Sequence, residues 1–116
     1  MPRIEESTLI KDVQIVTFQL FGDDRGRFTE TFRKEWFPQR AWDRFQSNRS
    51  DSKAGVLRGL HYHFHQVDYW IVAAGKIQAA LYDLRPDSPT RGVAQTLEMG
   101  GDSQLGVFIP VGVAHG

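Results

Sequence analysis

Three histidines at alternate positions are the feature that most constrains how this chain can fold. His61, His63 and His65 stand in the stretch Gly55–Gly75, GVLRGLHYHFHQVDYWIVAAG, and are three of the four histidines in the sequence. In an extended strand, residues two apart lie on the same face of the sheet. The spacing therefore predicts a strand over 56–64 that presents imidazoles to one side. A His-x-His pair on a strand can bind a metal or place an imidazole base in a pocket.

Size, charge and cysteine content exclude several classes of protein. The 116 residues predict a single domain, 1–116. Fourteen basic and fourteen acidic residues cancel, so bulk charge provides no surface for nucleic acid or membrane. The absence of cysteine excludes disulfides, thiol catalysis and cysteine–metal sites. The first residues lack the form of a secretory signal, which favours a cytoplasmic protein.

Short apolar or alternating runs separated by turn residues predict a mostly β structure. The segment GDDRG at 22–26 predicts a hairpin turn, and Gly75 predicts a tight turn that pairs the strands on either side of it. Only Lys34–Phe45 is typical of a helix, and Pro38 limits it to short pieces. We expect strands over Val13–Phe21, Arg27–Phe32, Val56–Phe64, Asp68–Ala74, Lys76–Asp83, Val93–Met99 and Leu105–Ile109.

The spacing of these strands and turns favours an all-β fold, a jelly-roll β-barrel with a pocket inside and one short helix. The sequence stops at His115-Gly116, where a further strand would begin. We therefore expect a barrel that is incomplete at its C-terminus, formed by the N-terminal part of a longer chain.

Several segments then carry a resemblance to a known family. They are GVLRGLHY, LYDLRPDSPTRG and FIPVGVAHG, preceded by DDRGRFTETF and FQSNRSDS. In this order they resemble the dTDP-4-dehydrorhamnose 3,5-epimerase family of the cupin superfold. The resemblance implies an isomerase that inverts carbon 3, carbon 5 or both of a dTDP-4-keto-6-deoxy hexose without a cofactor, in deoxysugar biosynthesis of the rhamnose type. It also implies a homodimer that exchanges N-terminal strands.

The resemblance implies site residues as well. The reaction removes a proton next to a ketone, which requires a base, a stabiliser of the enolate oxygen and an acid. His61 matches the general base of the family. The positions that match substrate-contacting residues of the family are Arg25, Phe28, Glu30, Gln46, Asn48, Arg58 and His115. Arginines suit the diphosphate because their planar guanidinium groups match phosphate oxygens.

Two positions depart from the family pattern. His63 stands where the family usually has glutamine, and Asp68 stands where the family has a lysine that helps to hold the enolate. A carboxylate at that place would repel an enolate. The tyrosine acid of the family, and the aspartate that orients its base, correspond to positions beyond Gly116.

The same departures support two alternative functions. Gly55, His61-x-His63, Asp68 and Gly75 have the spacing of the metal-binding cupin motif, and Pro110-x-Gly112-x-x-His115 resembles its second half. This alternative predicts a divalent transition metal, in an isomerase or dioxygenase, bound by His61, His63, Asp68 and His115. The second alternative is a sugar-nucleotide-binding cupin that does not catalyse a reaction.

The sequence also predicts how three further residues are placed in the structure. Arg58 is three positions from His61, so a regular strand would direct the two side chains to opposite faces. A shared pocket therefore requires an irregular backbone at Gly59. We expect His65 at a turn or on the surface, and we expect Arg85 to form a structural pair with Asp83.

Overall fold

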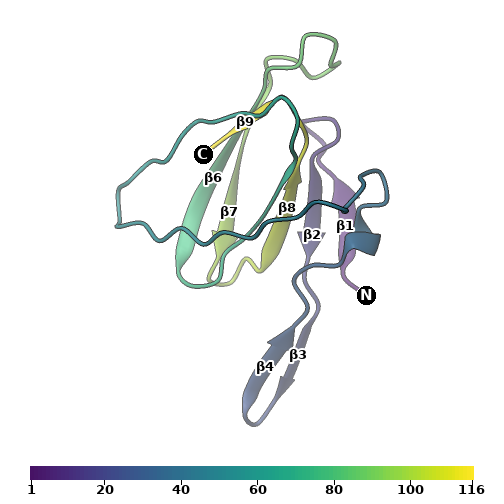
Figure 1. Ribbon diagram of the computed structural model, residues 1–116. Coiled ribbons are helices and arrows are strands. Elements are labelled where there is room, and N and C mark those ends of the chain that lie inside the picture. The colour runs from purple at the N-terminus through teal and green to yellow at the C-terminus, as the bar shows by residue number, and fades with distance from the viewer.

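Nine β-strands and one short 3-10 helix form the regular structure of the chain in the computed structural model, which describes residues 1–116 (Figure 1). They are β1 (Arg3–Glu6), β2 (Gln14–Thr17), β3 (Leu20–Asp23), β4 (Gly26–Thr29), η1 (Lys34–Trp36), β5 (Asp68–Ile71), β6 (Lys76–Asp83), β7 (Ala94–Gly100), β8 (Leu105–Ile109) and β9 (Val113–His115). The structure contains no helix whose length and hydropathy would let it span a bilayer.

The strands form three antiparallel sheets. The largest has the order β1-β2-β8-β5, and a second has the order β7-β6-β9. The third is the hairpin β3–β4, which extends away from the other two sheets in Figure 1. A long segment without regular structure, between η1 and β5, runs across the larger sheets in the same view.

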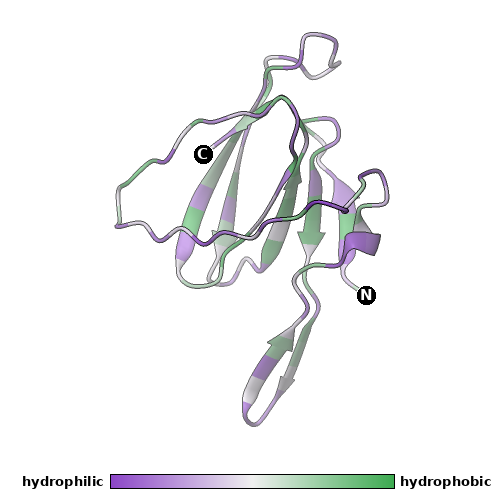
Figure 2. Cartoon of the chain, in the orientation of Figure 1, coloured by the Kyte–Doolittle hydropathy of each residue, from purple (hydrophilic) through white to green (hydrophobic).

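The main core lies between the two larger sheets. Strand β8 supplies Val107 and Ile109 to it, and the strands of the other sheet supply Leu81, Met99 and Val113, among others. Figure 2 shows hydrophobic residues along the strands of these sheets. Burying this apolar surface from both sheets is the main force that holds them together.

Strand β8 is buried on both of its faces. Phe108 points away from the main core, because neighbouring side chains on a strand alternate between faces, and it joins a second cluster with Val16 and Phe18. Trp36 and Phe37 cover this second cluster.

Of the short helical pieces expected within Lys34–Phe45, the structure contains the single 3-10 turn of η1. Beyond it, the indole Nε1 of Trp42 donates a hydrogen bond to the carbonyl oxygen of Phe37 at 3.0 Å. Pro38 follows Phe37 directly, and a proline disfavours the helical conformation in the residue before it. Tertiary packing of the aromatic side chains, instead of helical hydrogen bonds, fixes this segment.

Two expectations about pairing are wrong. The stretch expected as a strand over Val56–Phe64 contains only one isolated bridge, between His61 and His115. Strands β5 and β6 do not form a hairpin with each other, because β5 pairs with β8 while β6 pairs with β7 and β9. The turn at Gly75, with φ of 82°, therefore carries the chain from one sheet to the other.

Other boundaries agree more closely with the sequence analysis. Lys76–Asp83 and Leu105–Ile109 are strands over the predicted residues. The hairpin turn after β3 is confirmed, but the strand predicted over Val13–Phe21 is divided between β2 and β3, in different sheets. Strand β1 was not predicted from the sequence.

The pairing of Asp83 with Arg85 is confirmed as a structural feature. The carboxylate of Asp83 is fully buried and accepts hydrogen bonds from Arg85 Nε at 2.9 Å, Ser88 Oγ at 2.6 Å and Thr90 Oγ1 at 2.7 Å. Arg85 Nη1 also donates to Asp12 Oδ2 at 2.9 Å, which ties the loop after β6 to the loop before β2. The segment DLRPDSPT thus closes one end of the sheets.

Candidate functional site

A group of three ionisable side chains lies where β5 and β9 meet the loop before β5. Asp68 Oδ2 is 2.9 Å from His115 Nε2 and 3.4 Å from His63 Nε2. The side chain of His115 is 5% exposed, that of Asp68 is 22% exposed and that of His63 is 33% exposed. The group is therefore anchored in the protein at His115 and accessible to solvent at His63.

Strand alternation explains why Asp68 and His115 face each other. Asp68 is two residues before Trp70, and Trp70 packs against the main core. His115 is two residues after Val113, which lies within that core. Residues two apart share a face of a strand, so both side chains point into the space between the two larger sheets.

Hydrogen bonds fix the orientation of the His115 ring. Its Nδ1 lies 2.9 Å from the carbonyl oxygen of Val113, which can only accept, so Nδ1 carries a proton and Nε2 faces Asp68. Burial opposes the charged ring, but the hydrogen bonds to Asp68 and Val113 outweigh burial and raise the pKa of His115 above its ordinary 6.5. The hydrogen bond from His115 lowers the pKa of Asp68, although burial opposes this.

Two neighbours that the sequence analysis did not assign to the site support this group. The indole of Trp70 stands edge-on to the His115 ring, with ring centroids 5.2 Å apart. Gln66 Nε2 donates to Asp68 Oδ1 at 3.2 Å. The sequence indicates Gln66 only weakly, as a polar residue two positions before the aspartate that starts a strand. Trp70 gave no signal beyond its apolar strand.

His61 lies beside the group but is not part of it. Its backbone N–H and carbonyl both bond to His115, at 2.8 Å each, in an antiparallel bridge. Residues directly opposite in such a bridge project their side chains to the same face. His61 is therefore on the face of the sheet that His115 occupies, but it is exposed and contributes no atom to the cluster of ligating groups formed by His63, Asp68 and His115.

The backbone before His61 is irregular, as a shared pocket with Arg58 requires. Gly59 has φ of 128°, and a Cβ there would lie 2.8 Å from the carbonyl oxygen of His115. Only glycine can adopt this backbone angle so close to β9 without strain. Arg58 is exposed, and its guanidinium donates to Ser52 Oγ at 2.6 Å and to the Asp51 carbonyl at 3.1 Å.

The site residues predicted at 25–30 lie on or next to the projecting hairpin and not in the group around Asp68. Arg25 pairs with Asp23 at the tip of the projecting hairpin, and Phe28 on the same hairpin is 66% exposed (Figure 1). Glu30 forms an ion pair with Arg33. Within one chain, Arg25, Phe28 and Glu30 have their partners on the hairpin or at Arg33, away from the group around Asp68.

A large groove connects two other predicted residues to this group. It has a volume of about 1060 Å³, and Gln46, Asn48, Asp68 and Trp70 are among its lining residues. Gln46 Nε2 donates to Asn48 Oδ1 at 3.1 Å. His65, expected on the surface, is exposed, and its carbonyl accepts a hydrogen bond from Arg40 at 2.6 Å.

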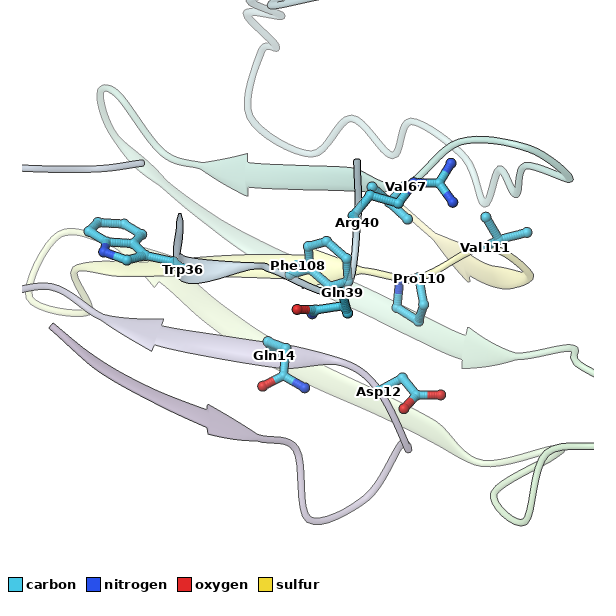
Figure 3. A pocket seen from close by; sticks show the side chains of 9 residues that line it. All are labelled: Asp12, Gln14, Trp36, Gln39, Arg40, Val67, Phe108, Pro110 and Val111. Atoms are coloured by element: carbon cyan, nitrogen blue, oxygen red, sulfur yellow. The ribbon is translucent and has the colours of Figure 1, made fainter. Parts of the chain in front are cut away.

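A second cavity, of about 550 Å³, lies against β2 and β8 and shares Gln39, Arg40 and Val67 with the groove (Figure 3). Gln14 and Phe108, which pair across β2 and β8, line it together with Trp36 and Arg40. None of the residues predicted for the site lines this cavity. The cluster, the groove and His61 are therefore the better candidate site.

The fold and this arrangement define the chain as a jelly-roll protein with ionisable side chains between its two sheets. Two β-sheets pack face to face in a jelly-roll, and an imidazole and a carboxylate project into the space between them. Such a site can move protons or bind a cation. It contains no thiol or serine nucleophile with an imidazole base beside it.

The chain belongs to the dTDP-4-dehydrorhamnose 3,5-epimerase family, whose sequence profile matches residues 7–116. This family consists of enzymes of the isomerase class. The chain is 39% identical over 113 residues to the spore coat polysaccharide biosynthesis protein SpsL of Bacillus subtilis (strain 168), covering 93% of this chain and 70% of that protein. It is 38% identical over 113 residues to a dTDP-4-dehydrorhamnose 3,5-epimerase of Neisseria gonorrhoeae, covering 94% of this chain and 34% of that one.

Solved structures of the family share the fold. The dTDP-6-deoxy-D-glucose-3,5-epimerase of Legionella pneumophila Philadelphia 1, in complex with dTDP-4-keto-L-rhamnose, superposes with a TM-score of 0.85 at 33% identity. That comparison covers 99% of this chain and 63% of the Legionella chain. The chain thus spans about two thirds of the length of this relative. The predictions of family and of an all-β jelly-roll fold are confirmed.

Proposed function

We propose that this chain carries the site of an epimerase that acts on a dTDP-4-keto-6-deoxy hexose and inverts carbon 3, carbon 5 or both. Family membership is the observation that carries this proposal. The position of His61, bridged to His115 on the face that lines the space between the sheets, agrees with it. The reaction is a series of proton transfers and consumes no redox cofactor.

His61 is the proposed base. It takes the proton from the carbon next to the ketone, and the electron pair of the broken C–H bond moves onto the keto oxygen to form an enolate. A proton delivered to the opposite face of that carbon completes the inversion. His61 suits this role because it is exposed, whereas the His115 ring is bound to Asp68 and Val113.

Binding of the nucleotide is proposed for residues outside the cluster. Gln46 and Asn48 line the groove, and Arg58 is exposed before His61. Arg25 and Phe28 lie on the hairpin that projects from the sheets. We therefore propose a homodimer in which this hairpin serves the groove of the partner, where arginine would bind the pyrophosphate and phenylalanine would stack on the base.

Isotope exchange tests the proposed reaction. The full-length protein, incubated in heavy water with a dTDP-4-keto-6-deoxy hexose, is expected to introduce deuterium at carbon 3, carbon 5 or both. His61→Ala should abolish this exchange. Asp87→Asn, at an exposed position outside the groove, is the control and should retain it. Exchange that persists in His61→Ala would overturn the assignment of the base.

A mixing experiment tests the exchanged hairpin. In the proposed dimer, one subunit supplies Arg25 and the other supplies His61 to the same site. Arg25→Ala and His61→Ala therefore each remove a residue that a different subunit supplies. If the hairpin serves the partner, a mixture of the two inactive variants forms heterodimers with one intact site, and part of the exchange activity returns. No recovery in subunits shown to exchange would place Arg25 outside the partner's site.

A further inference from the structure

We propose that His63, Asp68 and His115 bind one divalent transition-metal ion. These residues offer two imidazole nitrogens and one carboxylate oxygen, a donor set that suits Zn, Fe, Mn or Ni. The three come from a loop, from β5 and from β9, so the fold itself brings them together.

The distances between the donor atoms fit one ion. All three atoms lie within 4.8 Å of one another. Ligands about 2.1 Å from a tetrahedral ion lie about 3.4 Å from each other. The separation of His63 Nε2 and Asp68 Oδ2 is 3.4 Å, and that of His115 Nε2 and Asp68 Oδ2 is 2.9 Å. Small side-chain shifts would place the ion at the common centre.

Neighbouring hydrogen bonds orient two of the donors as metal sites require. A histidine ligand usually donates its second ring N–H to a carbonyl or carboxylate, which directs the other nitrogen at the metal. The Nδ1 of His115 donates to the Val113 carbonyl, so Nε2 is the nitrogen that faces Asp68. Gln66 holds Oδ1 of Asp68 and leaves Oδ2 directed at the two rings.

Exposure allows an ion to enter and leaves a coordination position open. His115 is almost fully buried, but Asp68 lines the large groove and a third of the His63 side chain is exposed. Three protein ligands with one open position are typical of catalytic metal sites, whereas structural sites have four. The open position would face the groove.

The role of such an ion rests on the proposed function, although its binding does not. Asp68 alone would repel a developing enolate. A divalent cation held by one carboxylate and two neutral imidazoles gives the site a net positive charge. When bound, it would act as a Lewis acid towards an oxygen of the substrate.

His61 is excluded from this proposed ligand set. It was one of four ligands in the metal-binding alternative, but only His63, Asp68 and His115 form the cluster. The geometry therefore separates two neighbouring roles on one face, a metal ligand at His115 and an unligated imidazole at His61. Replacing His61 should leave metal binding unchanged.

Metal binding by the full-length, tag-free protein tests this inference. The protein is stripped with a chelator, freed of it and titrated with Co²⁺ and with Zn²⁺, and the affinity and stoichiometry are measured by calorimetry and metal analysis. We expect one ion per chain and the visible absorption bands of nitrogen- and oxygen-bound cobalt. His63→Ala and Asp68→Asn should each weaken binding by at least about 100-fold.

Matched variants make the outcome decisive. His65→Ala and His61→Ala change exposed histidines outside the cluster and should bind as the unchanged protein does. His63 lies in a loop outside the strands, so its replacement tests the site even if Asp68→Asn fails to fold. Absence of binding, binding that survives His63→Ala, or loss in His65→Ala would overturn the inference. Because no substrate is present, these results are independent of the epimerase test.

Discussion

Asp83 and Asp68 are both aspartates at the end of a strand, but their surroundings differ. Asp83 is fully buried, and its partners Arg85, Ser88 and Thr90 all follow it within one loop. Asp68 is partly exposed, and His115 and His63 reach it from separate segments of the chain. One carboxylate is saturated by local donors, and the other faces a groove.

This difference distinguishes a carboxylate with a structural role from one that we propose as a ligand. The hydrogen bonds to Asp83 occupy both of its oxygens and close a loop, so a ligand would find no free acceptor. Asp68 retains capacity on the oxygen that faces the two imidazoles. We therefore expect substitutions at Asp83 to affect mainly folding, and substitutions at Asp68 to affect mainly binding and catalysis.

The largest effect on stability is expected for Asp83→Asn. The change removes the buried one of the two carboxylates that Arg85 faces, while the Arg85 side chain remains only 19% exposed. Breaking a buried pair in this way costs about 3 kcal/mol. Urea denaturation of the variant measures the loss. Asp87→Asn, at an exposed position in the same loop, is the control and should stay within about 0.5 kcal/mol of the unchanged protein.

Gly112→Ala should have the next largest effect. Gly112 has φ of 85°, and a Cβ there would lie 2.6 Å from Cγ of Arg85. Backbone strain and this overlap together should cost about 1–2 kcal/mol, again measured with urea. Gly22→Ala is the control, because its nearest neighbour would be a carbonyl oxygen 3.8 Å away. Equal losses in the two variants would contradict the close packing at Arg85.

Acid should weaken the Asp83 loop in a defined pH range. Burial raises the pKa of Asp83, but hydrogen bonds from Arg85, Ser88 and Thr90 together outweigh it and hold the pKa below the ordinary 3.8. Ionised Asp83 therefore stabilises the fold above pH 3.8, and this contribution is lost as the pH falls through the lower pKa of the folded state. The stability difference between the unchanged protein and Asp83→Asn should shrink below pH 3.8. A constant difference down to the acid transition would refute this role.

The smallest effect on stability is expected for Asp68→Asn, at most about 1 kcal/mol, because the asparagine can still accept a hydrogen bond from His115 at this partly exposed position. The same variant should lose most of its deuterium exchange. Urea denaturation and exchange measured on one preparation check both expectations. A loss of stability as large as that of Asp83→Asn would remove the contrast between the two aspartates.

Much of the secondary structure could be predicted from local patterns. The runs at Lys76–Asp83 and Leu105–Ile109 became strands over the predicted residues. The turn residues of 22–26 formed the predicted hairpin. Within Lys34–Phe45, where Pro38 limited the prediction to short helical pieces, one 3-10 turn formed, and Trp36 and Phe37 pack into the second cluster.

The residue types of the candidate site could be predicted from the sequence, but which of these residues lie together could not. The spacing of the histidines and Asp68 indicated ligands or a base, and the family motifs indicated which residues to consider. The alternation predicted a strand over 56–64 with imidazoles on one face, and we expected His65 at a turn or on the surface. The structure has one bridge at His61 in place of that strand and puts His63 in the cluster, while His65 is exposed as expected.

The sequence by itself determined the family, the β character of the chain and the residue types that its chemistry can use. Only the tertiary structure decided that β5 pairs with β8 instead of β6, and that Asp68 therefore meets His115. The physical reason is that periodicity specifies which face of a strand is buried but not which strand lies beside it. That choice depends on contacts between residues far apart in the chain.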